Sequence, residues 1–317
     1  MLNLIDYQNG IHAFDADYVR PGMAAIHLIE SEGRAAFVDT GTSAALPRAE
    51  AALRILGLDN SAVDYVILTH IHLDHAGGAG AMMAAFPNAR LVVHPRGARH
   101  MAAPDKLFAG VKAVYGEAQA TRLYGELLPV PAARIIEATD GLSLTLGAKT
   151  LVCLDSPGHA RHHMVIHDLQ AAAVFTGDTF GISYRECDAQ DRALIFPSST
   201  PVQFEPEALH ASIDRILACQ PRAVYLTHFS ERTSVAELGA RLHRLVDGHV
   251  AAVRRHADAG AVRHACVREE LARLLLAEAQ AIGNTQSEAE LREIWATDLE
   301  LNAQGLCVWL DQQEKSA

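Results

Sequence analysis

Residues 69–75 read Thr69-His70-Ile71-His72-Leu73-Asp74-His75. This stretch places three imidazoles and one carboxylate within six consecutive positions. Imidazole nitrogen and carboxylate oxygen are ligands that transition metals of intermediate hardness prefer. A structural zinc site normally closes its coordination shell with cysteine thiolates, whereas a shell of nitrogen and oxygen more often leaves a position for water. The stretch therefore predicts a catalytic metal centre.

The residues around this stretch predict a strand, a loop and a helix. Residues 65–69 are apolar and mostly β-branched or aromatic, as expected for a buried strand. The glycines in Ala76-Gly77-Gly78 allow a tight turn, and we expect a helix to begin at or near Asp74 and to stop before Pro87. In α/β layers, chemistry lies at the carboxyl ends of strands. A chance cluster among the 17 histidines of the chain would not explain this context.

Composition and charge favour a soluble globular protein. The chain has 317 residues, of which 50% are hydrophobic and 21% charged. Its net charge of −11 gives no electrostatic support to nucleic-acid binding. No apolar run approaches the ~20 residues of a membrane span, and we expect no signal peptide. Five widely spaced cysteines without a CxxC pair fit a reducing compartment. We therefore expect a cytoplasmic protein without nucleic-acid or membrane partners.

The chain is expected to form two domains. Residues 1–232 alternate short strands with helices and form the expected catalytic domain. We expect strands over residues 23–30, 34–39, 65–69, 91–94, 142–146, 150–154, 164–167 and 223–227, and helices over residues 47–56, 79–86, 106–123 and 205–217. Residues 233–317 have apolar side chains at helical spacing. They predict an all-helical extension with helices over residues 234–256, 261–282 and 287–301, the last capped by Ser287 or Thr285.

Three further motifs place metal-capable side chains at the ends of expected strands. They read Asp155-Ser156-Pro157-Gly158-His159, Phe175-Thr176-Gly177-Asp178 and Tyr225-Leu226-Thr227-His228. Each has an ordinary explanation when taken alone: a turn histidine, a helix cap and a polar strand terminus. All of them nevertheless repeat the context of the first stretch, in which a ligand follows a strand. The four motifs together favour one shared metal site.

The complete set resembles the signature of the metallo-β-lactamase-fold superfamily over about residues 10–230. The resemblance implies an α/β fold, the αββα four-layer sandwich, followed here by the C-terminal helical extension. It also implies seven ligands for two divalent metal ions: His70, His72 and His159 for the first ion, Asp74, His75 and His228 for the second, and Asp178 as the bridge.

Two further residues are candidates for contacts with these ligands. Asp39, in Val38-Asp39-Thr40-Gly41, matches the early aspartate of the family. We expect it to orient a metal-bound histidine. His163 is a second candidate for such a contact near His159, with a plain surface histidine as the alternative.

The chemistry that the resemblance implies is hydrolysis by a hydroxide shared between the two ions, since each cation lowers the pKa of bound water. The hydroxide would attack a carbonyl or phosphoryl centre while the ions carry the charge on the substrate oxygen. Asp74 is the expected catalytic residue, which orients the hydroxide or carries its proton. We expect zinc, with iron and manganese as alternatives, because ligands that are all nitrogen and oxygen accept each of them.

The aspartate pair of Asp74 and Asp178 is similar to that of glyoxalase II, acyl-homoserine lactonases and thioesterase-like members. It differs from true β-lactamases, whose bridging position is not an aspartate. We therefore expect an enzyme that hydrolyses an ester-like acyl bond in a small molecule, either a thioester or a lactone. The segment after Asp178 departs from glyoxalase II, which puts glutathione thioesters in doubt. The alternatives are a di-iron redox protein that reduces oxygen and a regulatory protein that retains a metal site.

Three expectations concern the regions around this site. Tyr184 and Arg185 could bind the polar end of an acyl substrate, although a solvated loop is the preferred interpretation. The helix expected over residues 106–123 is a candidate to lie over the site. The Ala/Leu-rich helical extension offers a surface for a homodimer.

Overall fold

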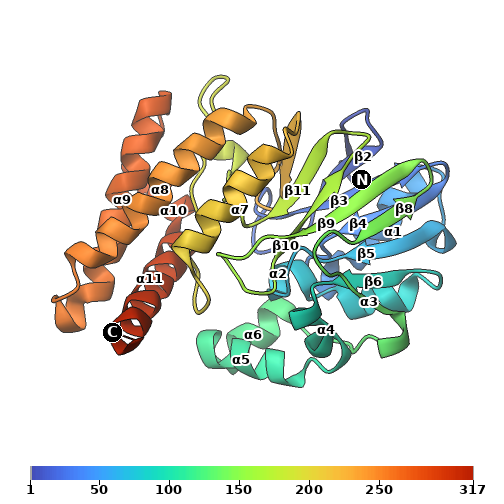
Figure 1. Cartoon of the computed structure of the whole chain (residues 1–317), viewed down its shortest axis with the longest axis horizontal. Helices are drawn as coiled ribbons and strands as arrows, with labels where there is room; N and C mark the ends of the chain where they lie inside the picture. Colours follow the sequence, from blue (N-terminus) through green and yellow to red (C-terminus); the bar gives the residue numbers. More distant parts are fainter. Residues whose placement is uncertain (1, 317) are drawn as a thin grey trace. The chain divides into compact units, whose positions relative to one another are not determined.

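Apolar strands from the first part of the chain pair into two sheets (Figure 1). The computed structural model describes residues 2–316. The first sheet has the order β1 (Ile5–Asp6), β2 (Ile11–Asp15), β3 (Ala25–Ser31), β4 (Arg34–Val38), β5 (Val63–Ile67), β6 (Arg90–Val93) and β7 (Ile135–Glu137). The second has the order β13 (Ser230–Arg232), β12 (Ala223–Leu226), β11 (Ala173–Gly177), β10 (Met164–Asp168), β9 (Lys149–Asp155) and β8 (Ser143–Leu146).

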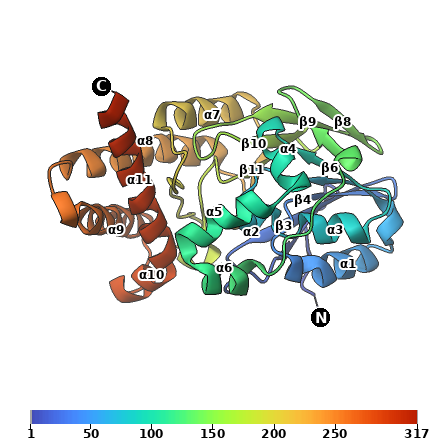
Figure 2. The ribbon, with the colours of Figure 1, turned by 90° about the horizontal axis from the view of Figure 1, so that it is seen from below.

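Both faces of the first sheet are buried. One face meets the second sheet in a core to which Val38 and Ile67 contribute from one side and Leu151 and Phe175 from the other. The opposite face packs on α1 (Leu46–Ile55), α3 (Ala79–Ala85) and α4 (Pro95–Ala102), and Figure 2 shows α1 and α3 beside β3 and β4. Burial on both sides explains why β4 and β5 read as nearly continuous apolar runs. The layers place the carboxyl ends of β4, β5 and β12 at the loops that carry the predicted ligands.

The chain divides into two compact units, each of which is described by itself. Unit 1 comprises Met1–Asp155, His162–Gly177 and Pro221–Glu231, and unit 2 comprises Ser156–Arg161, Asp178–Gln220 and Arg232–Ala317. Unit 1 holds strands β1–β12 and helices α1–α6, and unit 2 holds helices α7–α11. The units interleave along the sequence because unit 2 takes two segments from the first 232 residues. The expected domain boundary after residue 232 stays a prediction.

The C-terminal helices of unit 2 confirm the expected helical region. They are α8 (Val235–Arg255), α9 (Arg263–Ile282), α10 (Glu288–Ile294) and α11 (Ala296–Ser316). Apolar side chains at helical spacing are buried along them, such as Leu242 and Leu245 on α8. Ser287 caps α10: its hydroxyl accepts from the Glu290 N–H, and the Glu290 carboxylate accepts from the Ser287 N–H. Within residues 2–316, no helix combines the length and apolarity that a membrane crossing requires.

Three expected helices are each interrupted. The helix expected to begin near Asp74 and to stop before Pro87 is α2 (Leu73–Ala76) and α3, separated at Gly77 and Gly78. The helix expected over residues 106–123 is α5 (Asp105–Tyr115) and α6 (Glu117–Tyr124), separated at Gly116, whose φ of +80° lies outside the helical range. The helix expected over residues 287–301 ends with α10, and α11 begins after the fully buried Trp295. We also did not expect β1, β2, β7, β13 or α4. The strands β1 and β7 have only two and three residues, too few for a periodic pattern.

Candidate metal centre

Three side chains of unit 1 direct their donor atoms at one point. Asp74 and His75 lie on α2 (Leu73–Ala76), which follows β5, and His228 comes shortly after β12. Oδ2 of Asp74 lies 3.6 Å from Nε2 of His75 and 3.4 Å from Nε2 of His228. The three residues offer ligand atoms that lie within 4.8 Å of one another. A tetrahedral zinc ion with bonds of about 2.0–2.1 Å holds its ligand atoms roughly 3.3 Å apart. This donor set therefore fits a transition metal ion.

The second ring nitrogen of each of these histidines is bound elsewhere. Nδ1 of His75 lies 2.8 Å from Oδ2 of Asp39, and Nδ1 of His228 lies 2.6 Å from the carbonyl oxygen of Met23. Both partners accept hydrogen bonds, so Nδ1 carries the hydrogen and Nε2 keeps its lone pair. Such outer contacts fix the tautomer and the orientation of metal-binding imidazoles.

Asp39 connects three of the loops at this edge of unit 1. It directly follows β4 and has a φ of +59°. Its buried carboxylate accepts hydrogen bonds from the backbone N–H and the hydroxyl of Thr69 and from the hydroxyl of Thr227, in addition to His75. These contacts fix the position of the Asp39 carboxylate beside His75, and the expected role of Asp39 in orienting a metal-bound histidine stays a prediction.

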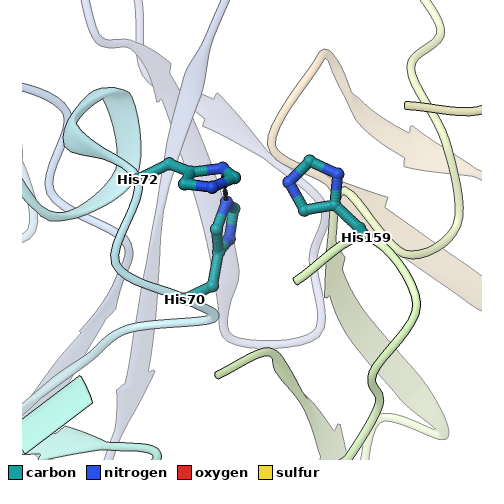
Figure 3. A group of neighbouring side chains, drawn as sticks. All are labelled: His70, His72 and His159. Carbon is teal, nitrogen blue, oxygen red and sulfur yellow. Dashed lines mark hydrogen bonds between the residues drawn. The ribbon is translucent and has the colours of Figure 1, made fainter. Parts of the chain in front are cut away.

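His70 and His72 form a second pair in unit 1. Nε2 of His70 lies 2.9 Å from Nδ1 of His72, a contact that Figure 3 marks with a dashed line. The ring of His163 stacks on that of His70, with centroids 4.8 Å apart. His163 is fully buried, so the alternative of a plain surface histidine is wrong. The ring that it contacts is that of His70, whereas the expected contact was near His159; a role of His163 in orienting a metal ligand stays a prediction.

The remaining two predicted ligands meet within unit 2. Nε2 of His159, whose ring is also drawn in Figure 3, lies 3.5 Å from Oδ2 of Asp178. Nδ1 of His159 lies 3.2 Å from the carbonyl oxygen of Ser198, so this imidazole is oriented in the same way as His75 and His228. The preceding Gly158 has a φ of +127°, and a Cβ there would lie 2.3 Å from the backbone nitrogen of Leu209 on α7 (Pro206–Ala218). Only glycine fits this turn.

The segment that follows Asp178 is held by the C-terminal helices of unit 2. The hydroxyl of Tyr184 donates to the carboxylate of Asp298 on α11 at 3.2 Å. Asn302, also on α11, donates to the carbonyl of Pro197 and accepts from the N–H of Ser199. Ser199 adjoins Ser198, which binds His159. Sequence reasoning missed these anchors, because neither Asp298 nor Asn302 lies in a motif.

Tyr184 and Arg185 have different surroundings. Tyr184 is 1% exposed, so the preferred interpretation of a solvated loop is wrong for this residue. The side chain of Arg185 is 43% exposed and lies 3.9 Å from the carboxylate of Asp188. Substrate contacts of either residue stay a prediction.

Two histidines near the ligand loop were not among the predicted site residues. Nδ1 of His162 lies 3.5 Å from the backbone nitrogen of Ile71, between two proposed ligands. Nε2 of His94 lies 3.0 Å from Oδ1 of Asp155. Burial lowers the pKa of His94, and the charge of Asp155 offsets part of this effect. The sequence feature that could have pointed to His162 is its position next to His163, shortly after the proposed ligand His159.

The sequence of this chain matches a known protein family. The model of the metallo-beta-lactamase superfamily matches residues 19–229, more than half of the chain. The chain belongs to this superfamily. Membership places it in the class of metal-dependent hydrolases, and the histidine and aspartate clusters fit that class.

Curated relatives in the superfamily differ in how much of the chain they match. The metallo-beta-lactamase fold-containing protein ST1585 of Sulfurisphaera tokodaii is 26% identical over 224 residues, 69% of this chain and 78% of that protein. A hydroxyacylglutathione hydrolase of Stenotrophomonas maltophilia is 30% identical over 153 residues, 48% of this chain and 44% of that protein. The N-acyl homoserine lactonase AttM of Azorhizobium caulinodans is 33% identical over 113 residues, 36% of this chain and 38% of that protein. The chain thus matches less than half the length of either named hydrolase.

A solved structure shows the same fold along nearly the whole chain. The crystal structure of ST1585 from Sulfolobus tokodaii has a TM-score of 0.63 and 21% identity, and the match covers 94% of this chain and 98% of that one. The expected fold class, the metallo-β-lactamase sandwich with a C-terminal helical region, is confirmed.

Proposed function

We propose that this superfamily member hydrolyses an ester-like acyl bond, a thioester or a lactone, with two divalent transition metal ions. The observation that carries the proposal is the convergence of Nε2 of His75, Nε2 of His228 and Oδ2 of Asp74 in unit 1. The names of two relatives, a hydroxyacylglutathione hydrolase and an N-acyl homoserine lactonase, support an acyl carbonyl as the reacting centre. Zinc is the metal that we propose, with iron and manganese as alternatives.

Family membership supports the assignment of ligands to two ions. The proposed ligands are His70, His72 and His159 for the first ion, Asp74, His75 and His228 for the second, and Asp178 as the bridge. Within each unit the paired donor atoms lie 2.9–3.6 Å apart, which is the spacing that a shared cation requires. Three of the imidazoles also have their outer nitrogen bound to an oxygen acceptor, as metal-binding histidines do.

Asp74 is the residue that we propose as catalytic. When bound, the two ions supply an activated water and polarise the substrate carbonyl. The side chain of Asp74 is 21% exposed, whereas those of His75 and Asp39 are sealed from solvent. Asp74 therefore reaches both the ligand cluster and the solvent side, where it can orient the attacking water and hold its proton. No serine or cysteine nucleophile is needed for this reaction.

The proposal extends to substrate contacts and partners. The exposed Arg185 is the residue that we propose for the polar end of an acyl substrate, and Tyr184 would position its loop through Asp298. With a net charge of −11, we propose a small-molecule substrate in the cytoplasm, without nucleic-acid or membrane partners. The helical C-terminal region is the surface that we propose for a homodimer.

A hydrolysis panel tests the proposal. Metal-free protein is reconstituted separately with zinc, iron and manganese and assayed on acyl-thioesters, lactones and phosphodiesters. We expect turnover of a thioester or a lactone, and its loss in Asp74→Asn, which keeps the size of the side chain and removes its charge. The variant Asp64→Asn is the matched control, since Asp64 pairs with Arg34 away from the site. Activity on phosphodiesters alone would refute the substrate class. Oxygen consumption with reduced iron and no hydrolysis would favour a redox protein instead.

A further inference from the structure

A cluster of two histidines and two aspartates lies between α7 and α8 in unit 2, helices that run beside each other in Figures 1 and 2. Nδ1 of His210 on α7 lies 2.7 Å from Nδ1 of His243 on α8. Nε2 of His210 lies 3.2 Å from Oδ1 of Asp247, and Nε2 of His243 lies 3.1 Å from Oδ1 of Asp214. Each aspartate thus binds the histidine of the other helix. None of the four residues is a proposed ligand of the catalytic ions.

The helix geometry explains how the four side chains meet. Each aspartate follows the histidine of its own helix by four positions, so the two side chains share one helix face. The helices approach closely at Gly239, one turn before His243, where a Cβ would lie 2.8 Å from Cδ2 of Leu217 on α7. Both histidine side chains remain 27% exposed. Ions in solution can therefore reach them.

The two imidazoles direct their in-plane lone pairs at each other. The ring planes differ by only 7°, and the centroids are 5.0 Å apart. Because the Nδ1 atoms are much closer together than the centroids, the rings meet edge to edge. An ionised carboxylate only accepts hydrogen bonds, so each Nε2 carries a hydrogen and each Nδ1 is left with a lone pair. Two lone pairs at 2.7 Å repel unless a proton or a cation lies between them.

We propose that His210 and His243 bind one divalent transition metal ion between their Nδ1 atoms. Imidazole suits nickel, copper and zinc. Two bonds of about 2.0–2.1 Å at a tetrahedral angle separate the nitrogens by roughly 3.3 Å. The partly exposed rings therefore need to part by about half an ångström and to rotate so that both lone pairs point at the ion. Asp214 and Asp247 accept hydrogen bonds from the two histidines, as the outer carboxylates beside metal-binding histidines do, and so fix the orientation of the rings. Water fills the remaining positions, which keeps this site weaker than the proposed catalytic centre.

The ion would join α7 to α8 next to a segment that carries a proposed catalytic ligand. Leu209 and Ser212 of α7 contact the turn before His159, the latter through a hydrogen bond of 2.6 Å from its hydroxyl to the carbonyl oxygen of Pro157. A link between the two helices would therefore raise the thermal stability of the part of unit 2 that supports this turn.

The experiment counts a metal ion beyond those of the catalytic centre. The full chain is first saturated with zinc, desalted, and dialysed against micromolar nickel, and bound zinc and nickel are measured by elemental analysis. We expect the wild type to bind one more nickel ion per chain than His210→Ala or His243→Ala, with zinc content equal in all three. Nickel should also raise the Tm of the wild type and leave that of these variants unchanged. Asp214→Asn combined with Asp247→Asn should weaken nickel binding about 10- to 100-fold.

Two further variants keep the test decisive. His264→Ala removes another surface histidine that pairs with a carboxylate, that of Glu300 at 3.2 Å, but has no second imidazole beside it, and it should bind nickel as the wild type does. His243→Gln retains the polarity and bulk of the side chain in case the alanine variant folds poorly, and should still lose the extra ion. Equal nickel binding in the wild type and in His243→Gln would overturn the proposal. Loss of the extra ion in His264→Ala would overturn it as well.

Discussion

Oδ2 of Asp39 accepts a hydrogen bond from Nδ1 of His75 over 2.8 Å, and both side chains are sealed from solvent. The contact leaves Nε2 of His75 to face Asp74. A buried carboxylate is costly unless it is hydrogen-bonded, and Asp39 meets this requirement with donors from Thr69 and Thr227 as well. One carboxylate thus orients a proposed ligand and ties together the loops that follow β4, β5 and β12.

The variant Asp39→Asn should lose metal ions while the chain stays folded. Its amide can present a donor to Nδ1 of His75, so the imidazole is no longer held in the tautomer that leaves Nε2 free. Loss of an outer partner of this kind typically costs 10- to 100-fold in metal affinity. The zinc retained after dialysis against graded chelator concentrations measures the effect. Thr227→Val is the control: it removes one donor to Asp39, leaves His75 untouched, and should cost about 1.5–3 kcal/mol of stability. Wild-type zinc retention in Asp39→Asn would contradict the orienting role.

His72→Ala and Asp178→Ala should each abolish turnover and lower the metal content. The first removes the partner of His70, and the second removes the carboxylate beside His159. Elemental analysis and the hydrolysis assay give the two readouts. His100→Ala, on α4, serves as a control without a proposed metal contact. Wild-type rates in either ligand variant would refute the mechanism.

The convergence of Asp74, His75 and His228 could be predicted from the sequence because the segments that carry them follow strands. A buried strand has a short apolar signature, and the residue after it must lie at the sheet edge. This rule places His70, His228 and Asp39 at the sheet edge, whereas Asp74 lies on the short helix α2 that follows the loop after β5. Burying a charged or imidazole side chain is costly unless it is paired. Several such side chains at the ends of buried strands therefore indicate a functional site.

The supports of these ligands could not be predicted, since they depend on contacts between distant segments. Asn302 lies 103 positions from Ser199, and Asp298 lies 114 positions from Tyr184. No local pattern marks such pairs. The break of the expected helix at Gly116 has a different cause: a glycine inside a helical pattern is usually tolerated, and only its φ of +80° shows that the helix ends there.

Asn302→Ala should destabilise the chain and loosen the segment that carries Ser198. The change leaves the N–H of Ser199 and the carbonyl of Pro197 without their side-chain partner, and each buried polar group left unsatisfied costs about 1–3 kcal/mol. Denaturant unfolding measures the loss. Gln304→Ala, two positions along α11, removes only a contact with Glu300 and should change stability by less than about 0.5 kcal/mol. Equal stabilities of the two variants would show that Asn302 is not an anchor.

Gly177→Ala should cost far more stability than Gly283→Ala. Both glycines have a positive φ, +49° and +85°, so both substitutions carry a backbone penalty of about 1–2 kcal/mol. At Gly283 nothing lies within 4 Å of the added Cβ. Only at Gly177 would the new Cβ collide, 2.5 Å from Nε2 of His163 and 2.7 Å from Oγ1 of Thr69. The difference between the two unfolding free energies therefore isolates the steric term. A displaced His163 would also disturb its stacking on His70, so Gly177→Ala should retain less zinc. Equal losses in both variants would rule out this crowding.

The stability of the fold should fall in acid partly because of His249. Burial lowers the pKa of this imidazole on α8 from 6.5 to about 3, so it stays neutral in the folded chain while the unfolded chain binds a proton below pH 6.5. Its contribution is complete above pH 6.5 and is lost progressively as the pH falls toward 3, at up to about 1.4 kcal/mol per pH unit. Urea unfolding at pH 7.5 and at pH 5 should therefore show a loss about 2 kcal/mol smaller in His249→Gln than in the wild type. If His249→Gln loses as much stability between the two pH values as the wild type does, this imidazole is not held neutral by burial.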